Sequence, residues 1–352
     1  MKNQNLRLDN LIHRFMSLTV CKSKMTIAII AFLTIISLNS CKKDKDKVDY
    51  RPSAAAFEAL RKEALDSLKQ TATFKAEVGI RFISKNRVTL TIPPNALTLG
   101  GLPVTGDVNL EYTEIFDPGN MAATNRPTMG ILPDGKQSLL NSGGEFNILV
   151  KQNGTLLNLA IPIPLVVPVK LTDSTAPDMQ IFKGNIDTKN NFAWTLQEPD
   201  LVKQTGIVVK RDAKDPITNV NELTYETLVG YFGWTNIDRF YSDPRPKTTM
   251  LVSVPDGYNY DNCALYLHYD GQGSSLARLD RYDEDKKLFT EHYGQIPIGL
   301  ACHLIFCTEE DGLWKYAIKP ITISADTVYS ISTAEMQKGK LKEYVGHVTL
   351  LK

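Results

Sequence analysis

The sequence predicts an all-β protein built from two β-sandwich domains, and three observations favour this class. Short segments with alternating apolar and polar residues recur from Lys75 to Leu351, which is the period of a half-buried strand. Residue pairs that favour turns, such as Pro93-Pro94 and Gly100-Gly101, separate these segments. Only the stretch from Ala54 to Gln70 repeats its apolar residues at helical spacing. Many short strands with regular turns are typical of sandwiches.

Length and composition support this organisation. The chain has 352 residues, of which 43% are hydrophobic, and its formal net charge is +1. This length suits two domains of ordinary size, and the hydrophobic fraction is sufficient for a packed core. Nucleic-acid binding needs a concentrated basic face, and no such face is visible. The sequence therefore predicts no nucleic-acid partner.

The N-terminal segment predicts a secretory signal. Met1 to Lys24 carries five basic residues and one acid, and Thr26 to Leu38 contains no charge, proline or glycine. This apolar run is shorter than the roughly 20 residues of a bilayer-spanning helix, so a cleaved signal peptide is favoured over a permanent anchor. The leader is long, and Met16 and Met25 are alternative starts.

The residues before Cys41 resemble a bacterial lipobox, because Leu38, Asn39 and Ser40 precede the cysteine. The resemblance implies cleavage after residue 40, so that 1–40 is a lipoprotein signal peptide and Cys41 carries the lipid. Several acyl chains would anchor the protein stably in a membrane, whereas one chain would be marginal. The alternative is an ordinary signal peptide with an incidental cysteine.

Residues 41–53 form a predicted tether, in which Lys42 to Lys47 is a run of charged residues. Such a run cannot bury itself and should be solvated. It resembles the surface-export tags of Bacteroidota lipoproteins, which implies an outer-membrane location with the cell surface slightly favoured over the periplasmic face. The alternative is a plain spacer.

After the tether, the sequence predicts a helix over 54–72. Phe57, Leu60, Ala64 and Leu68 recur at intervals of three and four residues and form one apolar stripe. We expect this short amphipathic helix to pack on the first domain or to serve as a stalk.

The first sandwich is predicted over 75–198. A hairpin is expected between Glu145–Val150 and Thr155–Leu159, because Asn153-Gly154 is a strong turn signal. Ile161 to Leu171 contains three prolines, which lack the donor that a central strand needs. The sequence therefore predicts an edge strand or an extended exit there.

Three segments of this region resemble ZU5-type β-sandwich domains, and especially the ZU5-like domains of uncharacterised Bacteroidota lipoproteins. They are Val88 to Leu97, Pro103 to Ile115 and Ser142 to Val150, and the resemblance covers about Val78 to Leu171. It implies a protein-interaction or structural module without a cofactor.

Residues 199–222 are rich in charge and proline and are the predicted linker. The second sandwich is predicted over 223–352, with an Ig-like arrangement of strands that includes Val345 to Leu351. Within it, Gly233 to Phe240 resembles a motif of the same lipoprotein group. Members of that group often have cysteine where this chain has Ile237, so no cysteine-dependent role is carried over.

The polar residues of this motif form the candidate ligand site or structural loop: Trp234, Asn236, Asp238 and Arg239. An aromatic ring beside these polar groups could stack on a sugar and hydrogen-bond to it. Alternatively, Asp238 and Arg239 could lock a loop while Trp234 fills the core, and the mixture of residue types favours this structural role.

Other candidate sites are weak. Cys263, Cys302 and Cys307 are expected to be buried structural thiols, and Cys302 and Cys307 should lie on opposite faces of one strand. The histidines have no chelating spacing. Two acidic loops, 256–262 and 280–285, have oxygen ligands that suit calcium, but solvated hairpin tips are favoured. We therefore predict no metal and no cofactor.

These features predict a lipid-anchored envelope protein that acts as a non-enzymatic interaction or structural module, with an unknown protein or glycan partner. The alternative is a carbohydrate-binding accessory lipoprotein of a glycan-uptake system. That function would require Trp194, Trp234, Trp314 and tyrosines to form an exposed platform. A hydrolase is a weaker alternative, because no catalytic motif is present; Gly271 to Ser275 does not match G-x-S-x-G.

Overall fold

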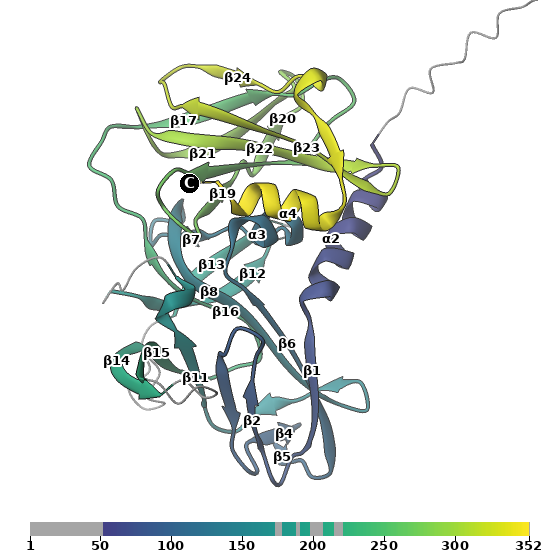
Figure 1. Cartoon of the computed structure of the whole chain (residues 1–352), viewed down its shortest axis with the longest axis vertical. Helices are drawn as coiled ribbons and strands as arrows, with labels where there is room; N and C mark the ends of the chain where they lie inside the picture. The colour runs from purple at the N-terminus through teal and green to yellow at the C-terminus, as the bar shows by residue number, and fades with distance from the viewer. Residues whose placement is uncertain (1–51, 173–177, 188–190, 198–206, 215–220, 352) are drawn as a thin grey trace, which may run out of the picture. The chain divides into compact units, whose positions relative to one another are not determined.

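The chain divides into two units, Met1–Tyr50 and Arg51–Lys352. The computed structural model describes residues 52–172, 178–187, 191–197, 207–214 and 221–351, all in the second unit (Figure 1). The predicted signal peptide, Cys41 and nearly all of the tether lie outside the described residues. None of the described helices is long and apolar enough to cross a membrane.

Helix α2 (Ala54–Leu68) begins at Ser53, whose hydroxyl accepts a hydrogen bond from Ala56 N. Phe57 and Ala64 are buried on one face, as the apolar stripe predicts. The helix ends before the predicted residue 72, because strand β1 (Gln70–Lys75) begins almost at once and pairs with β6. The described chain therefore passes directly from helix into sheet.

Strands dominate the fold, which confirms the all-β class. Sheets A, B and C make up the N-terminal β region. Sheet A has the order β1, β6 (Asp107–Ile115), β8 (Gln137–Gln152), β16 (Gly233–Phe240), β12 (Gln180–Ile186), β13 (Phe192–Leu196) and β7 (Met129–Ile131), with β9 (Thr155–Leu156) paired to β8. Sheet B has the order β14 (Ile207–Lys214), β15 (Asn221–Val229), β11 (Ile163–Pro168), β3 (Thr89–Ile92) and β2 (Ile80–Ile83). Sheet C contains β10 (Asn158–Leu159), β4 (Leu97–Leu99) and β5 (Leu102–Pro103).

Sheets A and B enclose the first core. Phe146 and Ile148 of β8 and Leu165 and Tyr225 of sheet B are fully buried in one cluster. The predicted hairpin is present, since β8 and β9 pair on either side of Asn153 and Gly154. Both turn residues have positive φ angles, 49° and 82°, which is the geometry that an Asn-Gly hairpin turn requires.

Strand β11 differs from its prediction. It lies between β15 and β3 and is therefore not an edge strand. Strand β3 pairs only with Leu165 and Val166, so neither Pro164 nor Pro168 belongs to that ladder. The short pairing on this side leaves few hydrogen bonds for the prolines to interrupt, whereas β15 pairs along the whole of β11.

The predicted domain boundary also differs from the observed strand pairing. Strand β15 pairs with β11, and β16 pairs with β8 and β12, so residues 221–240 complete the N-terminal β region. The physical reason is burial, because Tyr225, Val229 and Ile237 insert into the first core. Part of the predicted linker, 199–206 and 215–220, lies outside the described residues.

The C-terminal β region consists of sheets D and E. Sheet D has the order β20 (Arg281–Asp283), β21 (Leu288–Pro297), β17 (Lys247–Ser253) and β24 (Val328–Ser330). Sheet E has the order β19 (Leu276–Arg278), β18 (Cys263–Tyr269), β22 (Ala301–Glu310), β23 (Leu313–Thr322) and β25 (Gln337–Gly339). Residues of both sheets, including Val252, Phe289, Leu265 and Leu304, share a second core.

Three α-helices lie between the two β regions: α2, α3 (Pro118–Thr124) and α4 (Leu341–Thr349) (Figure 1). Single 3-10 turns occur at Val169–Leu171 and Thr333–Glu335. Helix α4 replaces the strand predicted at 345–351, because Tyr344 and Val348 lie one turn apart and are both buried. The Trp314 ring stacks on the Tyr344 ring, with 4.7 Å between the ring centroids. It packs edge-to-face with the Phe57 ring, with 6.0 Å between the centroids.

The three described cysteines are free and buried, as predicted. Cys302 belongs to the core between sheets D and E, whereas Cys307 faces the helices. Their odd spacing places them on opposite faces of β22, which confirms the sequence prediction.

Candidate functional site

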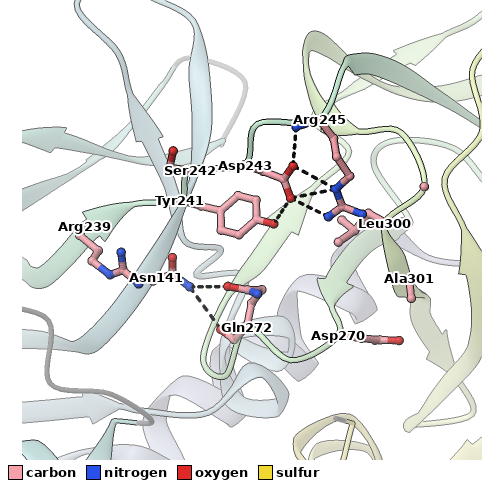
Figure 2. A pocket seen from close by; sticks show the side chains of 11 residues that line it. Asn141, Arg239, Tyr241, Ser242, Asp243, Arg245, Asp270, Gln272, Leu300 and Ala301 are labelled. Atoms are coloured by element: carbon pink, nitrogen blue, oxygen red, sulfur yellow. Dashed lines mark hydrogen bonds and ion pairs between the residues drawn. The ribbon is translucent and has the colours of Figure 1, made fainter.

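A cleft of about 490 Å³ opens where the two β regions meet (Figure 2). Its volume lies within the usual range for ligand pockets. The ends of β8 and β16, the segment that follows β16, the β18–β19 loop and the turn before β22 form its walls. The lining residues are Asn141, Arg239, Tyr241, Ser242, Asp243, Arg245, Asp270, Gln272, Gly299, Leu300 and Ala301.

Asp243 fixes one wall of the cleft. Its carboxylate accepts hydrogen bonds from Tyr241 Oη at 2.8 Å and from Arg245 N at 2.8 Å. The Arg245 guanidinium donates from Nε at 3.0 Å and from Nη2 at 2.6 Å. These bonds, above all those from Arg245, hold the pKa of Asp243 well below its ordinary value. The carboxylate therefore stays ionised and does not exchange protons near neutral pH.

The β18–β19 loop forms a second wall and contacts the N-terminal β region. Asn141 Nδ2 donates to Ser275 Oγ at 3.1 Å and to Gln272 Oε1 at 3.4 Å. Ser274 Oγ donates to the carbonyl of Phe116. These contacts join strands that are more than a hundred residues apart in the sequence, so the cleft is a product of the tertiary fold.

Asp270 lies on the side of the C-terminal β region. Its Oδ1 is 2.7 Å from Nδ1 of His303, a residue of β22, and Asp270 itself directly follows the neighbouring strand β18. Asp270 therefore lines the cleft while its carboxylate is held by His303.

A cluster of polar side chains lies immediately beside the cleft but is sealed from solvent. We call Ser142, Glu145, Asn236 and Asp238 the sealed cluster; the last three have no exposed surface. Asn236 Nδ2 donates to Asp238 Oδ2, and Gly143 N donates to Asp238 Oδ1 at 3.2 Å. A Cβ on Gly143 would lie 2.7 Å from Ile237 O, so glycine is required for this close approach.

Glu145 is the least satisfied member of the sealed cluster. It lies directly opposite Asn236 in the β8–β16 pairing, and both of its carboxylate oxygens are buried without a hydrogen-bond partner among the described atoms. Burial, followed by the charge of Asp238, raises the pKa of Glu145 well above its ordinary value. Burial likewise raises the pKa of Asp238. Both acids therefore tend to hold a proton.

Arg126 lies in the loop after α3, and its charge acts on Glu145 of this cluster. Its guanidinium lies 4.5 Å from the Phe192 ring centroid and 4.9 Å from that of Trp234. Burial lowers the pKa of Arg126 to about 10, so it remains charged at neutral pH. Trp194 packs beside them and donates from Nε1 to Pro127 O at 3.0 Å.

The structure separates the four residues of the candidate motif. Trp234 is half-buried among Phe192, Trp194 and Arg126. Asn236 and Asp238 belong to the sealed cluster, while Arg239 alone lines the cleft. The motif is therefore divided between packing, a sealed cluster and an open surface.

Sequence reasoning missed most of the cleft. Asn141, Asp243, Arg245, Asp270 and Gln272 come from three separate segments, and no local spacing connects these segments. The one available signal was Asp243-Pro244-Arg245 directly after the motif, since an acid and a base two residues apart around a proline favour a tight charged turn.

The other candidate sites have structural partners. His268 is buried with Nδ1 3.1 Å from Ser275 O, and His347 Nδ1 is 2.7 Å from Tyr316 Oη. In the loop 256–262, Asn262 donates to Gly257 O at 2.9 Å and holds the loop closed. Within the described ranges, no group of three or more histidine, cysteine or acidic residues could hold a metal ion.

Comparison with known protein families finds no family model that matches the chain, and no curated protein matches it. The observations define an all-β protein with a polar cleft at the junction of two β regions.

Proposed function

We propose that the protein is a lipid-anchored cell-envelope protein that works as a non-enzymatic binding module, with the cleft as its ligand site. In this proposal its β regions are a ZU5-like and an Ig-like sandwich. The sequence resemblances of Cys41 and of residues 78–171 support the class, and the cleft between the two β regions supports the binding role.

The protonation states of the acids carry the proposal. General acid–base catalysis needs an accessible group whose pKa lies near the working pH. In the cleft, Asp243 has a lowered pKa and is bonded to Tyr241 and Arg245. The acids with strongly raised pKa values, Glu145 and Asp238, have no exposed surface. Fixed charges on an open, polar surface suit recognition better than proton transfer.

The start of the described chain supports anchoring near the C-terminal β region. The carbonyl of Pro52 accepts a hydrogen bond from Asn262 Nδ2 at 3.3 Å. From Cys41 to Pro52 an extended chain spans at most about 40 Å. A lipid on Cys41 would then hold this region within about that distance of an outer membrane. The charged run Lys42 to Lys47 favours the cell surface over the periplasmic face.

A stacking platform for glycans receives no support. Every tryptophan, tyrosine and phenylalanine that the structure describes is buried or half-buried. Trp194 and Trp314 are at most 2% exposed. The proposal therefore rests on polar recognition in the cleft and not on aromatic stacking.

Lipid anchoring is tested by Cys41→Ala, with Cys21→Ala as the matched control because it removes a cysteine of the predicted leader. We expect the first variant to leave the detergent phase or to remain unprocessed, and the second to behave like the wild type. Normal detergent partitioning of Cys41→Ala would refute the anchor.

Binding in the cleft is tested by thermal-shift screening of small envelope sugars, peptides and acids with the full-length protein. Ala301→Trp fills the cleft, and Ala55→Trp places the same ring on an exposed position of α2 as a control. We expect a ligand whose shift disappears only in Ala301→Trp. Conversion of that ligand into a product, dependent on an open cleft, would make the protein an enzyme and overturn the proposal.

A further inference from the structure

Two side chains of the cleft, on paired positions of neighbouring strands, each have one buried polar atom without a partner. Arg239 and Asn141 face each other directly in the β16–β8 pairing, and both line the cleft (Figure 2). Arg239 Nε and Asn141 Oδ1 are buried and have no hydrogen-bond partner among the described atoms. A buried polar group that lacks a partner costs free energy. A ligand that enters the cleft and turns the two side chains towards itself would supply both missing bonds.

The Arg239 guanidinium is available for such a ligand. Its ion pair with Asp178 is long, at 3.9 Å, and the Asp178 side chain is 64% exposed. Arg245, the other arginine of the cleft, is instead held by three hydrogen bonds from its guanidinium to Asp243. Arg239 is therefore the cleft's loosely paired cation within the described part of the chain.

We propose that the cleft binds a small ligand through a carboxylate and a neighbouring hydroxyl group. The carboxylate pairs with the Arg239 guanidinium, whose planar fork matches two carboxylate oxygens. The hydroxyl donates to Asn141 Oδ1. This inference rests on the proposed binding function and names the ligand's chemical class. Simple hydroxy acids and the uronic-acid units of polysaccharides share this chemistry.

The remaining charges of the cleft favour one negative charge on the ligand. Asp243 and Asp270 also line the cleft, and a doubly charged phosphate would be repelled by both. The Asp243 carboxylate is already occupied by Tyr241 and Arg245, but the Asp270 side chain is 27% exposed and can accept a further hydroxyl group. A neutral sugar would leave Arg239 with only its long ion pair to Asp178, and a cation would be repelled by Arg239.

The experiment measures binding to the full-length protein in detergent by calorimetry. The probes are D-galacturonate, D-galactose, glycolate and trigalacturonate. D-galactose has the same ring hydroxyl groups but has a hydroxymethyl group in place of the carboxylate. Arg239→Gln removes the proposed partner, and Arg281→Gln removes the same charge from an exposed position on β20. Thermal unfolding of each variant checks that the fold is retained.

We expect galacturonate to bind at least tenfold more tightly than galactose, and Arg239→Gln to remove that preference while Arg281→Gln keeps it. Equal affinity for galactose and galacturonate, or unchanged binding in Arg239→Gln, would overturn the inference. Tighter binding of trigalacturonate identifies a polysaccharide source, whereas equal binding of glycolate identifies a simple hydroxy acid.

The two proposals fail separately. If no carboxylate probe binds but another ligand is lost in Ala301→Trp, the inference on ligand class is wrong and the binding function stands. If neither the probes nor the screened compounds respond to Ala301→Trp, both are wrong.

Discussion

Asp238 and Arg239 are neighbours in β16, yet they belong to regions with opposite character. Asp238 lies in the sealed cluster with no exposed surface, whereas the side chain of Arg239 is 33% exposed in the cleft. In the cluster, burial dominates the electrostatics and raises the pKa of both acids. In the cleft, the hydrogen bonds from the Arg245 side chain are the largest influence on Asp243, and they lower its pKa. The environment, more than the residue type, sets the chemistry of an aspartate.

The difference separates a region that holds the molecule together from one that is free to bind. The sealed cluster lies where sheet A meets the loop after α3, and the charge of Arg126 in that loop acts on Glu145. The cleft is open and polar, and its charges are partly paired. Changes in the first should alter folding, and changes in the second should alter recognition.

The largest expected effect is that of Asp238→Ala. It leaves the donors Gly143 N and Asn236 Nδ2 unpaired in the interior, and should lower the free energy of unfolding by about 3 kcal/mol. Arg239→Ala, one residue away, should cost less than about 1 kcal/mol, since exposed ion pairs contribute little. Urea unfolding of both variants measures the difference, and equal losses would contradict the comparison.

Glu145→Gln should have the opposite sign. The change keeps the shape of the side chain but removes a charge that burial disfavours, so the variant should be more stable than the wild type at pH 8 by roughly 1–2 kcal/mol. Glu111→Gln on the half-exposed face of β6 serves as the control. A loss of stability in Glu145→Gln would show that its carboxylate has a partner when ionised.

The dependence of stability on pH should differ in sign between the two regions. Glu145 and Asp238 have higher pKa values when folded than their ordinary 4.5 and 3.8. Their contribution is therefore complete below those values and is lost as the pH rises towards the folded pKa. Asp243 has a lowered pKa, so its contribution is present above 3.8 and is lost as the pH falls.

Measuring the free energy of unfolding across pH 3 to 9 separates the contributions of the two regions. The proteins compared are the wild type, the double variant Glu145→Gln with Asp238→Asn, and Asp243→Asn. The double variant should lose less stability on the alkaline side, and Asp243→Asn should lose less on the acid side. If the profiles of stability against pH remain parallel to that of the wild type, these acids do not cause the pH dependence.

The all-β class could be predicted because strand alternation and turn residues are local signals. Asn153-Gly154 sets its hairpin without help from the rest of the chain, and the spacing of Cys302 and Cys307 fixes their opposite faces. Residues 345–351 alternate like a strand, but Tyr344 and Val348 together form a helical stripe that packs against sheet E. Packing decided between two patterns that the local sequence allows.

The boundary and the cleft could not be predicted, because both depend on pairing between distant segments. The charged segment 199–222 has the composition of a linker, yet β15 and β16 beyond it return to β11 and β8. Asn141 and Gln272 meet only because these strands pair and the β18–β19 loop reaches them. No spacing in the sequence reports such a contact.

The smallest expected effect tests whether arginine geometry sets the charge of the cleft. Arg245→Lys keeps the positive charge but loses the paired donors to Asp243, so the free energy of unfolding should fall by less than about 1 kcal/mol. The pKa of Asp243, followed by carboxyl NMR, should rise towards its ordinary value, and the acid-side loss of stability should begin at higher pH. Arg81→Lys, at an exposed position of β2, is the matched control. An unchanged pKa in Arg245→Lys would mean that Tyr241 and the backbone N–H of residue 245 suffice to hold the carboxylate ionised, and that the cleft wall depends on hydrogen bonds more than on the guanidinium.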